Sequence, residues 1–138
     1  MGHVYEKLLV AVDGSAHADR AVVRAAELAR LAGSSVRVVH ACERTLSPAG
    51  MWYPEVEARR VTDRAVARVR QRGVQATGMV LRALQGTAAV AICDAADDAG
   101  ADLIVIGARG RTGLAELLLG SVALRVILLA RQPVLVTR

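Results

Sequence analysis

Leu103-Ile104-Val105-Ile106 is a run of four apolar residues, and a glycine-rich stretch, residues 107–113, follows it directly. A strand that is apolar at every position has both faces covered, as in a parallel sheet between two layers of helices. Residues Leu8–Val12 repeat this pattern near the start of the chain. We therefore expect both segments to be central strands of a parallel sheet.

Amphipathic helices are expected between the strands. Apolar residues recur at three- and four-residue spacing after Ser15, from Pro54 and from Thr87, and a glycine ends each pattern. The other strands are expected at residues 36–41, 76–81 and 134–136, and a last helix at about residues 121–130. Strands that alternate with helices through right-handed crossovers form an open α/β domain with helices on both faces. The length of 138 residues predicts one domain over residues 1–138.

Composition excludes several classes of protein. Hydrophobic residues make up 54% and charged residues 22%, which is typical of a globular chain. The longest apolar run, residues 88–93, is too short to cross a membrane, and the N-terminal apolar stretch is too short for a signal peptide. Cys42 and Cys93 are too far apart for a CxxC redox or zinc motif. We expect a cytoplasmic protein without membrane association.

The net charge of +5 raises the question of nucleic acid binding. Six arginines lie in the expected second helix: Arg59, Arg60, Arg64, Arg68, Arg70 and Arg72. The chain has one Trp, two Tyr and no Phe, so it lacks the interleaved aromatic residues on which bases stack. These arginines are therefore interpreted as a solvated helix face, and nucleic acid is not an expected partner.

The glycine-rich stretch follows the carboxyl end of a parallel strand, which is where open α/β sheets bind ligands. Glycines let backbone N–H groups approach a phosphate, and arginines add charge-assisted hydrogen bonds. Ser121 begins the next helix, where the helix dipole is positive. The residues that predict an anion site are Gly107, Arg109, Gly110, Arg111, Gly113, Gly120 and Ser121. A merely flexible connection is the alternative for this loop.

Two well-known phosphate motifs are absent. No two glycines are two residues apart, which excludes GxGxxG, and Lys7 is the only lysine, which excludes GxxxxGK[ST]. The pattern Gly107-x2-Gly110-x9-Gly120-Ser121 instead resembles the ATP-binding signature of the universal stress protein family. Similar flanking pieces are VAVDGS at residues 10–15 and GADLIVIGARGRTG at residues 100–113.

The resemblance covers essentially the whole chain. It implies a Rossmann-like, five-stranded parallel sheet of order 3-2-1-4-5 and binding of ATP, with Mg²⁺ or Mn²⁺. It also implies a homodimer, for which the edge strand Val134-Leu135-Val136 would be the pairing template.

The family's binding residues can be carried over by position. Ala11, Asp13 and Ala41 would line the adenosine part of the nucleotide. The ribose and phosphates would be held by Gly107, Arg109, Gly110, Gly120, Ser121 and Val122. For Asp13, a role as a turn former ahead of Gly14 remains an alternative.

We therefore expect an ATP-binding stress or regulatory protein that binds the nucleotide without turning it over. Hydrolysis needs a group that positions water and an acidic metal ligand near the phosphates. The carboxylates near the loop are Asp13, expected at the nucleoside end, and Glu116, whereas Asp102 precedes its strand at the other end of the sheet. A slow ATPase and an interaction module without nucleotide remain alternatives. Trp52 is either a lid over the nucleotide or a packing anchor.

Overall fold

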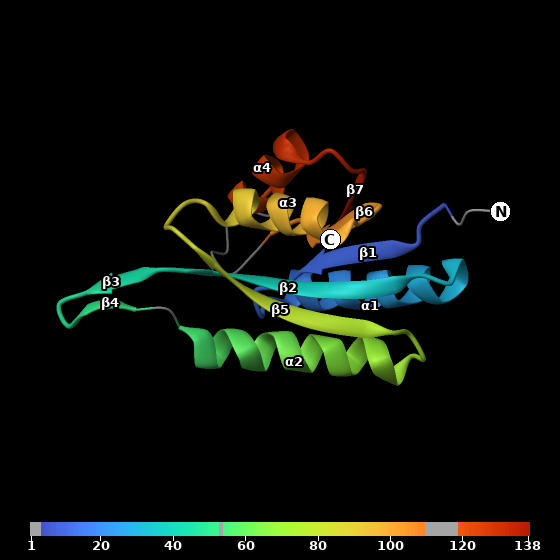
Figure 1. The fold of residues 1–138 in the computed structure, drawn as a ribbon, viewed down its shortest axis with the longest axis horizontal. Coiled ribbons are helices and arrows are strands. Elements are labelled where there is room, and N and C mark those ends of the chain that lie inside the picture. Colours follow the sequence, from blue (N-terminus) through green and yellow to red (C-terminus); the bar gives the residue numbers. More distant parts are fainter. Residues whose placement is uncertain (1–3, 53, 110–118) are drawn as a thin grey trace.

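A five-stranded parallel sheet forms the centre of the molecule (Figure 1). The structure is a computed structural model, and it describes residues 4–52, 54–109 and 119–138. The strands of this sheet are β1 (Lys7–Ala11), β2 (Ser35–Glu43), β5 (Ala76–Ala83), β6 (Leu103–Gly107) and β7 (Val134–Thr137). Their spatial order is β5-β2-β1-β6-β7. This order confirms the predicted order 3-2-1-4-5 of an open α/β domain.

Two pairs of helices cover the two faces of the sheet. The helices are α1 (Ala16–Ala32), α2 (Glu55–Gln71), α3 (Ala88–Ala99) and α4 (Ser121–Leu129). Helices α1 and α2 lie on one face, and α3 and α4 lie on the other (Figure 1). Within the described residues, no helix combines the length and the apolar character needed to cross a membrane.

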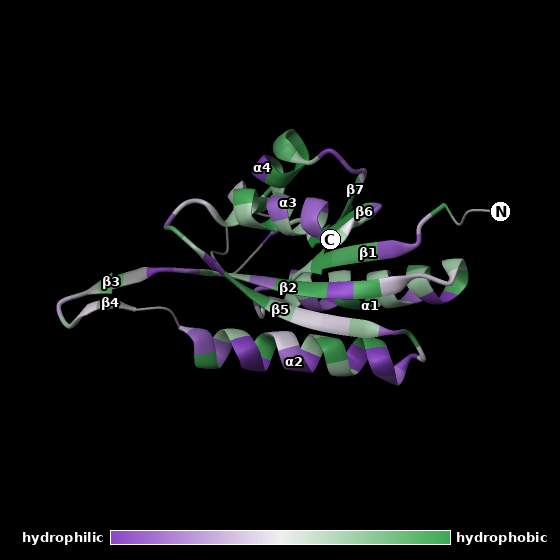
Figure 2. Cartoon of the chain, in the orientation of Figure 1, coloured by the Kyte–Doolittle hydropathy of each residue, from purple (hydrophilic) through white to green (hydrophobic). Residues whose placement is uncertain are grey.

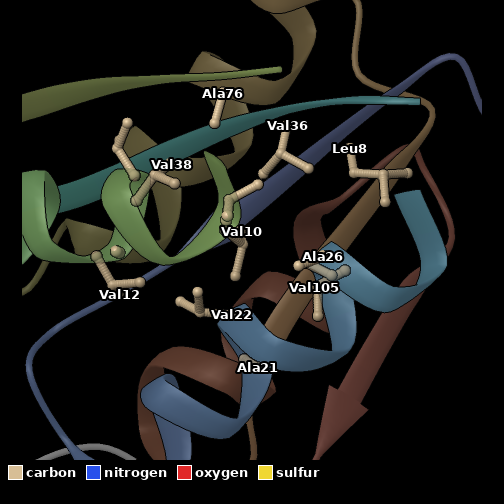
Figure 3. Close-up of a cluster of buried hydrophobic side chains, with 14 of the residues drawn as sticks. Leu8, Val10, Val12, Ala21, Val22, Ala26, Val36, Val38, Ala76 and Val105 are labelled. Atoms are coloured by element: carbon tan, nitrogen blue, oxygen red, sulfur yellow. The ribbon is translucent and has the colours of Figure 1, made fainter. Parts of the chain in front are cut away.

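The central strands are buried on both faces, as their unbroken apolar sequence predicts. In β1, Leu8 and Val10 point to the core beneath α1 and α2, while Leu9 points to the core beneath α3 and α4. All three side chains are completely buried. Figure 3 shows the first core, in which Val22 of α1 packs near Val10. Burying one such side chain stabilises the fold by about 1.5–3 kcal/mol.

A β-hairpin follows β2, in a segment where the sequence predicted no strand. Strands β3 (Thr45–Ser47) and β4 (Gly50–Trp52) pair antiparallel with each other and form a separate two-stranded sheet. Gly50 has a φ of +119°, a conformation that favours glycine and permits the tight turn. Figure 1 shows the hairpin extending beyond the carboxyl ends of the central strands. The side chain of Trp52 lies outside what the structure describes.

The outer face of α2 is hydrophilic, as Figure 2 shows. Arg59, Arg60 and Arg64 are exposed to solvent, and Arg68 lies 3.8 Å from the carboxylate of Asp19. Exposed pairs of this kind contribute little to stability. The interpretation of a solvated face is confirmed for these arginines.

Candidate functional site

A hollow of about 400 Å³ lies at the carboxyl ends of β1, β2 and β6. From β1 the chain first adds β2 and β5 on one side of the sheet, and then adds β6 and β7 on the other side. The gap between the carboxyl ends of β1 and β6 is therefore the topological switch point, where open α/β sheets bind ligands. Eight of the predicted site residues line this hollow: Ala11, Asp13, Ala41, Gly107, Arg109, Gly120, Ser121 and Val122. The other three, Gly110, Arg111 and Gly113, lie outside the described residues.

Other residues of the hollow were not predicted from the sequence. They are Val12, Ala18, His40, Cys42, Glu43, Pro54, Ala88, Ile92, Ile106 and Ala123. Most are apolar, so that much of the wall of the hollow is hydrophobic. The start of α3 supplies Ala88 and Ile92. The position of the start of α3 could have been inferred from the topology, because a helix that follows a parallel strand begins near the carboxyl end of that strand.

The N-terminus of α4 opens into the hollow without a capping side chain. Gly120 is the N-cap residue, and its carbonyl accepts the first helical hydrogen bond, from the N–H of Leu124 at 2.9 Å. The N–H groups of Ser121, Val122 and Ala123 therefore have no acceptor within the helix. By contrast, the hydroxyl of Ser15 caps α1 by accepting a hydrogen bond from the N–H of Ala18 at 3.1 Å. The start of α4 is consequently suited to an anion.

Arg109 brings a positive charge to the same hollow. Its Nη2 lies 3.5 Å from Nε2 of His17, in the first turn of α1. Because a guanidinium only donates, a hydrogen bond between the two side chains needs Nε2 of His17 as its acceptor. His17 thereby helps to hold the guanidinium between the start of α1 and the hollow.

Gly107 is glycine for a different reason from the one that the sequence suggested. A Cβ at this position would lie 2.8 Å from the carbonyl carbon of His17 and 2.9 Å from its oxygen. Such distances are prohibitive, because backbone cannot move aside as a flexible side chain can. The end of β6 therefore packs directly against the first turn of α1, and the glycine is required for that contact whether or not a ligand is bound.

Asp13 is a turn former, and it also lines the hollow. Its Oδ1 accepts a hydrogen bond from the N–H of Ser15 at 2.9 Å, which fixes the turn between β1 and α1. The same residue lines the hollow. The turn-former role is thus present, and it orients a carboxylate at the edge of the site.

Two hydrogen bonds hold the connection between β5 and α3 next to Glu43 and Ala88, which line the hollow. The carboxylate of Glu43, at the end of β2, accepts a hydrogen bond from the N–H of Gly86. The guanidinium of Arg125, on α4, donates to the carbonyl of Gly86 at 2.7 Å. These two bonds tie the connection between β5 and α3 to β2 and to α4. The rim of the hollow therefore depends on three elements that are distant in sequence.

Two side chains in the wall of the hollow, those of His40 and Cys42, are buried. His40 lies in β2 and is 8% exposed. Burial raises the pKa of the Cys42 thiol; the carboxylate of Glu55 raises it further, and Arg82 opposes this effect. Cys42 therefore stays a neutral thiol near pH 7 and is not an activated nucleophile.

The described residues do not offer a metal site of their own. Among them, no group of three or more His, Cys, Asp or Glu side chains lies close enough together to hold a metal ion. The carboxylates of the hollow are Asp13 and Glu43, and each already accepts a backbone hydrogen bond. Asp102 lies at the opposite edge of the sheet, where it accepts hydrogen bonds from the N–H groups of Glu6 and Lys7.

Comparison with known proteins gives one consistent result. The universal stress protein family matches residues 4–138. A universal stress protein of Thermus aquaticus, encoded in the QAH/OAS sulfhydrylase 3′ region, is 38% identical, over 98% of this chain and 100% of its own length.

Solved structures agree with the sequence comparison. The universal stress protein from Archaeoglobus fulgidus has a TM-score of 0.81 and 35% identity, covering 97% of this chain and 99% of that one. The structure of the Archaeoglobus fulgidus protein in complex with dAMP has a TM-score of 0.75 and 34% identity, covering 98% and 99% of the two chains. The fold, the glycine signature and these matches together place the chain in the universal stress protein family.

Proposed function

We propose that the protein binds an adenine nucleotide, ATP in the first place, in the hollow at the carboxyl ends of β1, β2 and β6. The observation that carries the proposal is that one hollow is lined by the uncapped start of α4, by Arg109 and by apolar side chains. The helix start and the arginine suit phosphates, and the apolar wall suits a base. The related Archaeoglobus fulgidus protein in complex with dAMP supports an adenine nucleotide as the ligand.

The proposed orientation follows from the chemistry of the walls. The base would lie against Ala11 and Ala41, and the backbone of Ala41 would offer it hydrogen bonds. The carboxylate of Asp13 would accept hydrogen bonds from ribose hydroxyls. The phosphates would point toward Gly107, Arg109, Gly120 and the start of α4, and the predicted roles of Gly110, Arg111 and Gly113 remain part of this proposal.

We propose binding without turnover as the working state, in a stress-response or regulatory role in the cytoplasm. Asp13 and Glu43 are the carboxylates of the described hollow, and both are engaged by backbone N–H groups. These hydrogen bonds fix the position of both carboxylates, and no third carboxylate of the described residues lines the hollow. Because these carboxylates do not form a metal site, Mg²⁺ or Mn²⁺ would enter with the phosphate oxygens of ATP.

Calorimetric titration with ATP tests the proposal. We expect saturable binding with a Kd of about 1 μM or below, which corresponds to roughly −8 kcal/mol or more favourable. Arg109→Gln should weaken binding at least tenfold, because it removes a charged donor to the phosphates. Arg64→Gln is the matched control: it removes an exposed charge from α2 and should leave the affinity unchanged. A folded wild-type protein that takes up no ATP would overturn the proposal.

Mass spectrometry of nucleotide released from freshly purified, denatured protein would identify which adenine nucleotide is carried. Phosphate release with Mg²⁺ present separates binding from catalysis. We expect rates near background, whereas turnover at about 1 s⁻¹ or faster would make the protein an ordinary enzyme.

We further propose that two copies pair through β7. This strand is at the edge of the sheet, and Leu135 is 39% exposed. The adjacent helix α4 carries an apolar face that the sequence analysis did not single out, with Leu124, Ile127, Leu128 and Leu129 between 42% and 73% exposed. An apolar helix face beside an unpaired strand edge is suited to a two-fold interface.

A further inference from the structure

A second hollow, of about 420 Å³, lies at the opposite edge of the sheet, where the strands begin. Its walls come from β1, β2, β5 and the last turn of α2. Lys7 and Ala11, which line the two hollows, are four residues apart along β1 and thus about 13 Å from each other. The second hollow is therefore separate from the proposed nucleotide site.

Three positively charged residues line this amino-edge hollow: Lys7 from β1, Arg37 from β2 and Arg70 from α2. Within residues 4–52, 54–109 and 119–138, none of the three has a carboxylate partner within 4.0 Å. Oδ2 of the nearby Asp102 accepts hydrogen bonds from the backbone N–H groups of Glu6 and Lys7, at 2.7 and 2.9 Å. Among the described residues, the three positive charges are thus not paired with a carboxylate in direct contact.

Neutral oxygens hold two of the three cations in place. Arg37 donates from Nε to the hydroxyl of Thr77 at 2.8 Å, and these two residues are register partners on β2 and β5. Arg70 donates from Nε and Nη2 to the carbonyl of Ala76, at 3.0 and 2.8 Å. Both guanidinium groups are oriented by these bonds without being neutralised, and each keeps further N–H donors. Arg70 is exposed, as predicted for this helix face, but its guanidinium is held by the carbonyl of Ala76.

We propose that the amino-edge hollow binds an oligophosphate anion, of which inorganic pyrophosphate is the smallest member. Oriented guanidinium groups bind phosphate oxygens in pairs, and the ammonium of Lys7 adds a point charge. Ser35 and Gln75 also line the hollow and supply neutral donors. A positive charge is also favourable near the negative C-terminal end of a helix, and Arg70 lies in the last turn of α2. This explanation does not apply to Lys7 and Arg37, because they lie on strands. A bound anion would instead compensate all three charges together.

Titration of the isotope-labelled full chain with inorganic pyrophosphate, followed by amide NMR, tests this site. We expect the amide signals of Ser35, Arg37 and Thr77 to shift saturably. The double variant Lys7→Gln, Arg37→Gln should raise the Kd at least tenfold. Arg60→Gln removes one positive charge from the exposed face of α2 and should leave the Kd within twofold.

The same spectra contain the outcomes that would overturn the site. Shifts confined to Gly107, Gly120 and Val122 would mean that pyrophosphate enters only the nucleotide hollow. An unchanged Kd in the double variant, with a well-dispersed spectrum, would exclude Lys7 and Arg37 as ligands. If the double variant does not fold, the wild-type titration decides alone: a saturable shift at Ser35 and Thr77 supports the site, and its absence contradicts it. This test is independent of whether ATP binds.

Discussion

At the scale of single residues, Gly107 shows how a signature residue can serve packing. The sequence suggested that the glycine gives a phosphate access to the backbone, whereas the structure shows that β6 needs it to approach His17. We expect Gly107→Ala to lower the free energy of unfolding by about 1–3 kcal/mol in the absence of ligand, as overpacking does. Urea denaturation measures this loss. Unchanged stability combined with lost ATP binding would instead assign the glycine to the ligand.

The two buried thiols predict a pH dependence of stability. Burial is the main cause that raises the pKa values of Cys42 and Cys93 above their ordinary value of 9.0. The folded state therefore holds these protons more tightly than the unfolded state does. The thiols contribute fully to stability at a pH below their pKa in the unfolded state. This contribution is lost as the pH rises toward their pKa in the folded state, and each thiol then lowers the free energy of unfolding by at most about 1.4 kcal/mol for each pH unit.

Urea denaturation between pH 7 and pH 10 measures this dependence. The wild-type protein should lose stability above about pH 9, the ordinary pKa of these thiols. The double variant Cys42→Ala, Cys93→Ala should lose less over the same range, although it starts from a lower stability because of its cavities. Parallel curves for the two proteins would contradict the assignment to the thiols.

At the scale of elements, the start of α4 is the clearest link between local structure and binding. Gly120 has φ −63° and ψ 152°, an extended conformation that an L-residue adopts without strain. Gly120→Asp would place a carboxylate where it can cap the open N–H groups. We expect the unliganded protein to gain about 1 kcal/mol of stability and ATP binding to weaken at least tenfold.

Thermal melting and calorimetry measure the two effects, and Gly120→Ala is the matched control. Alanine adds a Cβ without a carboxylate, so it should give no capping gain and a smaller loss of affinity. If Gly120→Asp binds ATP as tightly as the wild-type protein, the phosphates do not lie at the start of α4.

Helices and central strands were predictable because burial gives them a regular pattern. Strand β1 was expected at Leu8–Val12 and is found at Lys7–Ala11, since the apolar run fixes the strand but not its ends. The hairpin of β3 and β4 was missed, because strands of three residues are too short to show a periodic pattern. Its signals were confined to the residues near Pro48 and Gly50 that permit a turn.

At the scale of the whole molecule, the sequence predicted which residues gather at one edge of the sheet better than it predicted their contacts. Asp13 follows a predicted strand, Ala41 ends one and Gly120 directly precedes a predicted helix, so the order of the elements was enough to bring them together. Contacts such as Arg109 with His17 depend on side-chain reach across elements, which no local pattern encodes. The amino-edge hollow was missed for the same reason, because Lys7, Arg37 and Arg70 come from three separate elements.

The backbone of β7 makes the proposed dimer testable. The N–H groups of Ile104 and Ala108 donate to the carbonyls of Pro133 and Thr137, at 3.0 and 2.7 Å. Because backbone direction alternates along a strand, the N–H groups of Val134 and Val136 point to the open edge. Proline at position 136 would therefore remove a donor to a partner and leave the pairing with β6 intact.

Light scattering coupled to size-exclusion chromatography measures the oligomeric state. The wild-type protein should have twice the mass of one chain, and Val136→Pro should be monomeric. Leu128→Lys should also be monomeric, because a two-fold axis would bring two new charges together on a desolvated apolar face. Leu31→Lys is the matched control: Leu31, on α1, is 87% exposed and Leu128 is 73% exposed, so a change of surface charge alone should leave the dimer intact. A monomeric wild-type protein would contradict the dimer, and dimers in both Val136→Pro and Leu128→Lys would move the interface away from β7 and α4.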